Sequence, residues 1–232
     1  MRTGLDNRAA LPRTLTAILC TVIFGLVAPP GYADDWPEFR GKGRRGVWQE
    51  TGIVDAFPAE GLKVRWRTPI DPGWSSPVVS EGRVFLIDFS RAERGTDVVE
   101  RAVALDEETG RILWTRAWDA DYRTLGASWE GPRVTPTVDG NRVYVMGATG
   151  LFHTLDVETG EVLWTKDLMN DYGAPPPQWG FSSAPLVDGP RLITIVGGDD
   201  NARVVAFDKF TGEEIWRALP SDSDIGVPQP IV

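Results

Sequence analysis

A phrase of about ten residues, repeated roughly every fifty positions, limits the folds open to this chain. It reads LDVETGEVLW at 155–164, and near-copies stand at 104–114 (ALDEETGRILW) and 206–216 (AFDKFTGEEIW). Trp66 marks a fourth and weaker copy, 48 residues before the tryptophan of the next one. Repetition at a fixed period predicts one supersecondary unit stacked on copies of itself.

Each unit is predicted to contain four short strands joined by tight turns, here called A to D in chain order. Short apolar runs that alternate with turn residues are typical of strands rather than helices. In the second unit these runs are 134–138, 142–147, 151–156 and 161–166. In the third unit they are 184–187, 191–197, 203–208 and 213–218.

The repeated aspartate, glycine and tryptophan each have a structural explanation. The aspartate ends strand C, where its carboxylate can accept hydrogen bonds from the next backbone N–H groups, and the glycine supplies the left-handed residue of the C–D hairpin. The tryptophan and its apolar neighbour point to opposite faces of strand D, so both faces are expected to be covered. We expect each tryptophan to lie as a wedge between neighbouring units. These positions are Asp106, Gly110, Trp114, Asp156, Gly160, Trp164, Asp208, Gly212 and Trp216.

A four-stranded sheet covered on both faces by copies of itself is a β-propeller blade. The sequence therefore predicts an all-β, incomplete propeller; a two-sheet sandwich, the alternative, does not require one phrase at this period. The expected segments are an N-terminal extended segment (34–61), a closing outer strand (62–70), three blades (74–118, 129–168 and 181–218) and the start of a fourth (228–232). Because a closed propeller needs at least four blades, we expect the chain to be the N-terminal part of a longer protein.

The pattern A-x-D-x-x-T-G-x-x-x-W resembles the tryptophan-docking repeat of the pyrroloquinoline-quinone (PQQ)-like propellers. The opening DWPEFRG (35–41) and the block GPRVTPTVDGNRVYVMG (131–147) are similar to exported bacterial PQQ-like repeat proteins. This superfamily contains the quinoprotein alcohol dehydrogenases and the propeller lipoprotein of the outer-membrane barrel-assembly machinery. The resemblance implies the propeller fold, and it leaves function open because the family mixes enzymes with non-enzymes.

Residues 1–33 are predicted to be a signal peptide. Three arginines precede the apolar run LTAILCTVIFGLVA, and small residues at 31 and 33 fit cleavage after Ala33. The run is shorter than the ~20 residues of a membrane span. Cys20, the only cysteine, follows Leu19 rather than the small residue expected of a lipoprotein. The mature chain then has no disulfide and no thiolate metal site, and we expect it in the periplasm or secreted.

Charge and composition exclude several functions. Removal of residues 1–33 leaves 21 basic and 32 acidic residues, a net charge of −11, which argues against nucleic acid or anionic lipid as a partner. The single histidine, His153, lies in a strand-like run and is given no role. The acidic turns at 198–201 and 221–224 lack the spacing of a calcium site. No catalytic residue and no metal ligand is therefore predicted.

Binding is expected on one face of the propeller. Because strands alternate in direction, the A–B and C–D turns share one face, and the B–C and D–A connections share the other. The variable segments 89–100, 117–133 and 167–183 all belong to the second face, and variable loops on a rigid scaffold are where binding usually occurs. We therefore expect a protein or cell-envelope ligand on the D–A/B–C loop face, with no nucleic acid and no membrane span after signal cleavage.

An aromatic collar is the most specific candidate on that face. Trp74, Trp129, Trp179 and Phe181 stand just before successive A strands, with Arg133 beside them. A ring of aromatic side chains and a guanidinium suits a flat ligand or a partner peptide. The same side chains can instead pack blade against blade or plug the channel, and this is the interpretation that we favour.

Two functions remain. The first is a non-catalytic exported propeller that binds or scaffolds in the cell envelope. The alternative is the N-terminal part of a PQQ- and calcium-dependent alcohol or sugar dehydrogenase, which needs a base carboxylate, a Glu, Asn and Asp set for Ca²⁺ and a basic residue near the quinone. The resemblance also implies a vicinal disulfide in the alcohol dehydrogenases. The chain has no adjacent cysteines, and no calcium set can be assembled from it, so the non-catalytic function is our hypothesis.

Overall fold

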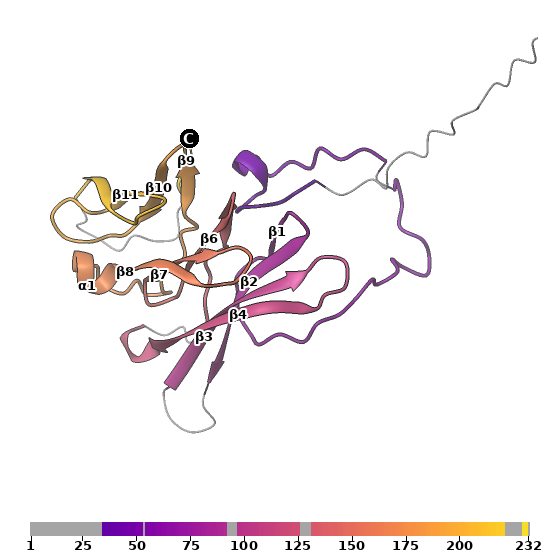
Figure 1. Cartoon of the computed structure of the whole chain (residues 1–232), viewed down its shortest axis with the longest axis horizontal. Coiled ribbons are helices and arrows are strands. Elements are labelled where there is room, and N and C mark those ends of the chain that lie inside the picture. The colour runs from indigo at the N-terminus through magenta and orange to yellow at the C-terminus, as the bar shows by residue number, and fades with distance from the viewer. Residues whose placement is uncertain (1–33, 53, 92–96, 126–130, 221–228, 232) are drawn as a thin grey trace, which may run out of the picture. The chain divides into compact units, whose positions relative to one another are not determined.

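The computed structural model describes residues 34–52, 54–91, 97–125, 131–220 and 229–231 (Figure 1). The predicted signal peptide at 1–33, the predicted collar residue Trp129 and the acidic turn at 221–224 lie outside the described residues.

Three antiparallel four-stranded sheets follow one another along the chain (Figure 1). The first contains β1 (Val78–Ser80), β2 (Arg83–Arg91), β3 (Asp97–Asp106) and β4 (Ile112–Asp121). The second contains β5 (Thr137–Asp139), β6 (Arg142–Met146), β7 (Leu151–Asp156) and β8 (Val162–Asp167). The third contains β9 (Leu186–Asp188), β10 (Arg191–Ile195), β11 (Val204–Asp208) and β12 (Glu214–Ala218). Within the described ranges the other elements are short: η1 (Lys42–Arg44), η2 (Tyr122–Thr124) and α1 (Leu168–Tyr172). The predicted all-β class with incomplete propeller blades is confirmed.

The first sheet is longer than predicted. Its β2–β3 ladder continues through Phe89↔Glu100 to Arg91↔Val98, so the ends of the expected B–C loop at 89–100 are strand. Strand β4 likewise continues into the expected connection at 117–133. The reason is that Phe89, Val98 and Ala120 of these extensions are buried together in one apolar cluster, and this burial favours strand over exposed loop.

Two other expectations concern segments outside the sheets. The connection at 167–183 contains the short helix α1, which Asp167 begins by accepting a hydrogen bond from the Asn170 backbone N–H at 3.1 Å. Residues 62–70 belong to no strand among the described residues, so their assignment as a closing outer strand stays a prediction.

The C–D hairpins are held by the repeated aspartate. The Asp156 carboxylate accepts hydrogen bonds from the backbone N–H groups of Glu158 and Thr159 at 3.0 and 2.9 Å, and these bonds hold its pKa below the usual value. Gly160 follows with φ of +68°, a left-handed conformation that glycine adopts without strain. The Asp106 and Asp208 turns are built in the same way.

Trp114 and Trp164 each lie against the C–D turn of the following sheet. Trp114 donates from Nε1 to the Val157 carbonyl at 3.0 Å, and its ring covers Gly160 so closely that a Cβ there would lie 2.6 Å from it. Trp164 stands in the same relation to Gly212, and Trp66 covers Gly110.

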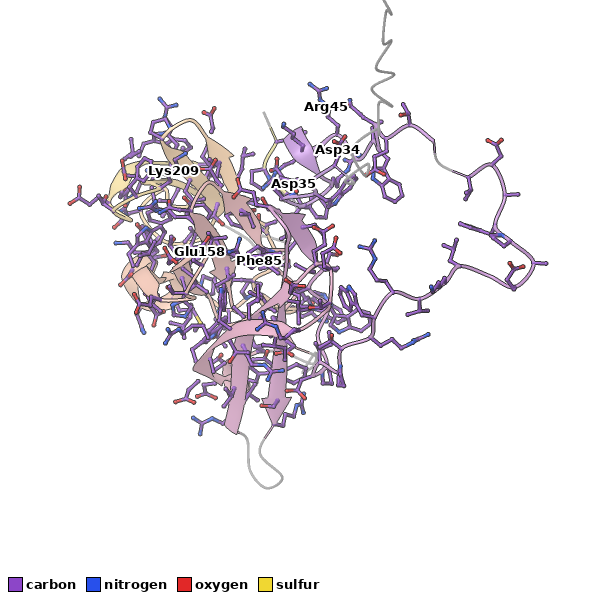
Figure 2. All side chains as sticks on the ribbon, turned by 45° about the vertical axis from the view of Figure 1, so that its right-hand side comes forward. Asp34, Asp35, Arg45, Phe85, Glu158 and Lys209 are labelled. Atoms are coloured by element: carbon purple, nitrogen blue, oxygen red, sulfur yellow. The ribbon has the colours of Figure 1, made fainter. Side chains whose placement is uncertain are left out.

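The core is packed between consecutive sheets. One cluster joins the first and second sheets through side chains such as Phe85, Ile87 and Leu155 (Phe85 is labelled in Figure 2). A second cluster, which includes Phe152 and Phe207, joins the second and third. The first strands also lie together, since β1 contacts β5 and β5 contacts β9. The first strands therefore form the inner edge of the array.

Candidate functional site

The turns on one face are regular and are linked from sheet to sheet. Arg83, at the start of β2, forms an ion pair with Glu158 in the β7–β8 turn at 2.9 Å. Lys209, in the β11–β12 turn, pairs with Asp139 at the end of β5 at 2.5 Å. Figure 2 labels Glu158 and Lys209. The first-to-second and third-to-fourth strand turns thus share this face, and their repeated bonds explain their uniform sequence.

The opposite ends of the strands carry the connections that lead into each sheet. Phe89, near the end of β2, donates its backbone N–H to Pro72 at 2.9 Å, and Phe181 donates to Ala148 in the β6–β7 turn at 2.9 Å. Asp199, in the β10–β11 turn, donates to Tyr172 in the connection from the second sheet. These connections and the second-to-third strand turns therefore share a face.

Three of the predicted collar residues meet there. The Arg133 guanidinium carbon lies 5.6 Å from the ring centroids of both Trp74 and Trp179. Arg133 also donates from Nε to the Trp179 carbonyl at 3.1 Å, and the Trp74 backbone N–H donates to Pro132 at 2.9 Å. We call Trp74, Arg133 and Trp179 the Trp–Arg–Trp cluster. Each member lies in the segment that leads into a different sheet.

The cluster is accessible. Trp74 is 59% exposed and Trp179 is 49% exposed, so the guanidinium is held between two indoles that still present surface to solvent. Beside Trp74 a groove of about 730 Å³ is lined by Pro72, Phe89 and Arg91 among others. Exposed tryptophan beside arginine is typical of energetically dominant positions in protein interfaces, and it also suits flat ligands.

One further predicted collar residue, Phe181, does not belong to this cluster. Phe181 is fully buried in the core between the second and third sheets, and its ring lies 2.6 Å from where a Cβ on Gly150 would be. Its role is packing, because a buried ring has no surface to offer a ligand. Trp129 lies outside the described residues.

Sequence reasoning missed a buried carboxylate between the first two sheets. Glu100 on β3 is fully buried and accepts hydrogen bonds from Trp118 Nε1 at 2.7 Å, the Tyr122 hydroxyl at 2.7 Å and the Ala148 backbone N–H at 2.8 Å. Burial raises the pKa of Glu100, and the three donors partly oppose that shift. The position of residue 100 in β3, on the same face as Val98 and Ala102, could have indicated that its side chain points inward. Its three partners lie 18 to 48 residues away, so the sequence could not have identified them.

His153 lies in the same interface. Its ring centroid is 4.7 Å from that of Trp118, and Nδ1 lies 2.8 Å from the Thr165 hydroxyl. Burial, helped by the charge of Arg116, lowers the pKa of His153 to about 4. The imidazole is therefore neutral at pH 7, and Nε2 has no hydrogen-bond partner among the described residues.

The acidic side chains do not gather into an ion site in the part of the chain that the structure describes. No group of three or more His, Cys, Asp or Glu side chains there is arranged to hold a metal ion. The buried carboxylates are engaged elsewhere: Glu100 by its three donors and Asp88 by Arg101, which it meets at 2.6 Å. The calcium ion of a PQQ site needs several oxygen ligands, so the described residues do not fit a calcium-bound quinone. A separate finding is that no helix in the described segments has the length and apolarity to cross a bilayer.

Known families and structures agree on the fold. Residues 98–231 match the family described as outer membrane protein assembly factor BamB. No curated protein matches the chain.

Among solved structures, the chain is similar to the quinohemoprotein alcohol dehydrogenase of Comamonas testosteroni, with 23% identity and a TM-score of 0.60 over 78% of this chain and 26% of that one. It is also similar to the quinohemoprotein alcohol dehydrogenase ADHIIG of Pseudomonas putida HK5, with 22% identity and a TM-score of 0.56 over 78% and 26%. BamB of Moraxella catarrhalis matches with 20% identity and a TM-score of 0.35 over 58% and 42%. The chain spans about a quarter of the length of the two dehydrogenases.

Proposed function

Because this chain belongs to the family described as outer membrane protein assembly factor BamB, with the PQQ-like propeller fold, we propose that it is a non-catalytic binding module of the cell envelope. The observation that carries the proposal is the Trp–Arg–Trp cluster. Both indoles are exposed, and the segments that lead into three successive sheets each contribute one member to the cluster.

The chemistry of the cluster favours a protein partner. Two half-exposed indoles supply large apolar contact area at a small cost in conformational entropy, and the guanidinium between them can bind a backbone carbonyl or a carboxylate. The groove beside Trp74, with Phe89 and Arg91 in its lining, extends the same kind of surface. A segment of a partner that carries an aromatic or acidic side chain would fit it.

An envelope location is part of the proposal. The basic leader and apolar run in residues 1–33 support export with cleavage after Ala33, and the family description names the outer membrane. Cysteine use is consistent with this, because the chain beyond residue 33 contains none and has no thiol to oxidise.

The alternative is part of a PQQ-dependent dehydrogenase. It is favoured by the structural likeness to two quinohemoprotein alcohol dehydrogenases, which at 23% and 22% identity is a likeness of fold. The described residues provide no group of carboxylates for a calcium ion, so we place this function second.

Site-specific photo-crosslinking tests the proposal. A photoreactive phenylalanine analogue placed at position 179 of the full-length protein should capture one defined envelope protein on irradiation. The matched control position is Phe210, which is 51% exposed and is also flanked by cations, with Arg142 at 4.7 Å and Lys209 at 5.2 Å, but lies in a turn on the opposite face.

Three outcomes decide between the functions. Capture from position 179 that is absent from position 210, and that is lost when Arg133→Ala is added, supports the binding module. Equal capture from both positions contradicts it. In a parallel arm, the full-length protein is mixed with PQQ and Ca²⁺ and assayed for dye reduction with alcohols and sugars; turnover would establish the dehydrogenase instead.

A further inference from the structure

The N-terminal segment crosses the inner edge of all three sheets. Trp36 forms an antiparallel bridge with Val79 on β1, with N–H to carbonyl distances of 2.9 and 3.0 Å. The next carbonyl, that of Pro37, accepts a hydrogen bond from the Val138 N–H on β5 at 2.8 Å. Arg44 then reaches the residues that lead into β9. We call residues 36–44 the inner strap.

Arg44 is the anchor of the inner strap at its far end. Its side chain is 3% exposed, and it donates to the Pro230 carbonyl at 2.8 Å, to the Ala184 carbonyl at 3.3 Å and to the Pro185 carbonyl. Its Nε donates to Glu38 at 3.0 Å. A guanidinium has five N–H donors in a fixed fork, and here they make five hydrogen bonds.

The backbone of the inner strap is held in a conformation that it would not adopt unaided. Arg40 and Arg44 have φ values of +63° and +55°, in the left-handed region that costs a residue with a side chain about 1–2 kcal/mol. Such conformations persist only where surrounding contacts fix them. The contacts here are the five bonds of Arg44 and the ring of Trp36, which lies 2.6 Å from where a Cβ on Gly41 would be.

The inner strap bonds to β1, to β5 and to the residues just before β9. The members of the Trp–Arg–Trp cluster stand in the segments that lead into these same three strands. Trp74 stands four residues before β1, Arg133 four before β5 and Trp179 seven before β9. The relative positions of these strands therefore set the distance from Arg133 to each indole. We propose that Arg44 is a positioning residue: by anchoring the inner strap to the third sheet, it fixes the Trp–Arg–Trp cluster.

Two readouts in the full-length protein test this, and neither needs a partner. The first is amide hydrogen exchange at Val79 and Val138, two strand amides that donate hydrogen bonds to the inner strap. The second is ¹⁹F NMR of 5-fluorotryptophan-labelled protein, with the Trp74, Trp114 and Trp179 signals assigned by single Trp→Phe replacements. The variant is Arg44→Ala, and the matched control is Arg45→Ala, the adjacent arginine, which is exposed and is labelled in Figure 2.

Arg44→Ala should speed exchange at Val138 about tenfold or more, because it removes charge-assisted hydrogen bonds that hold the local structure closed. It should also shift both the Trp74 and Trp179 signals, while Trp114 keeps its own. Arg45→Ala should change none of these. Arg44→Lys, which keeps the charge with three donors, should give intermediate exchange and partial return of both signals; it decides the matter if Arg44→Ala fails to fold.

The proposal is overturned if exchange and both signals are unchanged in Arg44→Ala, or if Arg45→Ala has the same effect. Faster exchange with unmoved Trp74 and Trp179 signals overturns the positioning role. The biological purpose of this positioning rests on the proposed function. The positioning itself does not depend on that function. Failure of the crosslinking experiment with success here would therefore reject the binding role alone.

Discussion

The indole of Trp114 covers Gly160 of the next sheet and donates its Nε1 hydrogen to the carbonyl of Val157, 3.0 Å away. A side chain at residue 160 and the ring of Trp114 cannot occupy the same space. The glycine of the repeated phrase thus has two reasons to be glycine, its left-handed backbone and the ring above it.

Gly160→Ala is expected to lower the free energy of unfolding by about 3 kcal/mol, because it combines a strained φ with overpacking against Trp114. The matched control is Gly140→Ala, at a glycine with φ of +55° whose Cβ would have nothing within 4 Å. That variant should lose only the backbone part, about 1–2 kcal/mol. Urea denaturation measures the free energy of unfolding of both variants. Equal losses in Gly160→Ala and Gly140→Ala would mean that Trp114 moves aside at no cost.

Removal of the indole itself tests the same interface from the other side. Trp114→Ala should cost about 3 kcal/mol or more, the usual range for a packed tryptophan. Trp179→Ala should cost about 1 kcal/mol or less, because that ring is half exposed and its contact is with Arg133. A large loss for Trp179→Ala would show that the cluster is structural, against the proposed binding role.

Because His153 is buried and neutral, we expect the protein to lose stability in mild acid. Its folded pKa of about 4 lies below the ordinary value of 6.5, so the unfolded chain takes up a proton first as the pH falls. Stability is therefore complete above pH 6.5 and is lost between about 6.5 and 4, by at most about 3 kcal/mol. The groups that face the ring are Arg116, Thr165 and, through Trp118, Glu100.

His153→Gln removes that ionisation and should flatten the pH profile of unfolding in this window. The measurement is the denaturation midpoint at several pH values for both proteins. Parallel profiles for the two proteins would contradict the assignment.

For Glu100 we expect the opposite dependence of stability on pH. Because burial raises its folded pKa above the ordinary value of 4.5, the folded state binds its proton more tightly than the unfolded chain. The resulting stabilisation is complete below pH 4.5 and is lost as the pH rises toward the folded pKa. Glu100→Gln should remove this part of the pH profile, whereas Glu161→Gln, at an exposed position, should leave the profile as in the wild type. A profile for Glu100→Gln that matches the wild type would contradict the prediction.

The repeated features could be predicted from sequence because their chemistry is local. Asp156 and Gly160 act within one hairpin, so five consecutive letters contain the information, and the alternation of apolar residues sets the strands on either side. The sequence predicts too short a β3. When the repeats are compared, a strand that is longer than the equivalent strand in the other repeats looks like an inserted loop.

The remaining features depend on contacts between distant parts of the chain. Arg44 meets carbonyls 140 and more residues away, and nothing in the letters GKGRRG distinguishes it from the exposed Arg45. Phe181 and Trp179 are two residues apart in one aromatic connection, yet one is in the core and the other at the surface. The sequence made both of them collar candidates, with packing as the favoured interpretation, and could not separate them, because it shows residue type and position but not which ring the adjacent sheet covers.

Trp114 reaches a glycine 46 residues ahead of it, and Trp164 reaches one 48 residues ahead. Each repeat therefore contains both partners of the contact between sheets. Its tryptophan packs on the next repeat, and its glycine leaves space for the tryptophan of the previous repeat. A tandem duplication of one such stretch of gene would bring its own matching pair, so arrays of this kind can lengthen without inventing any new contact.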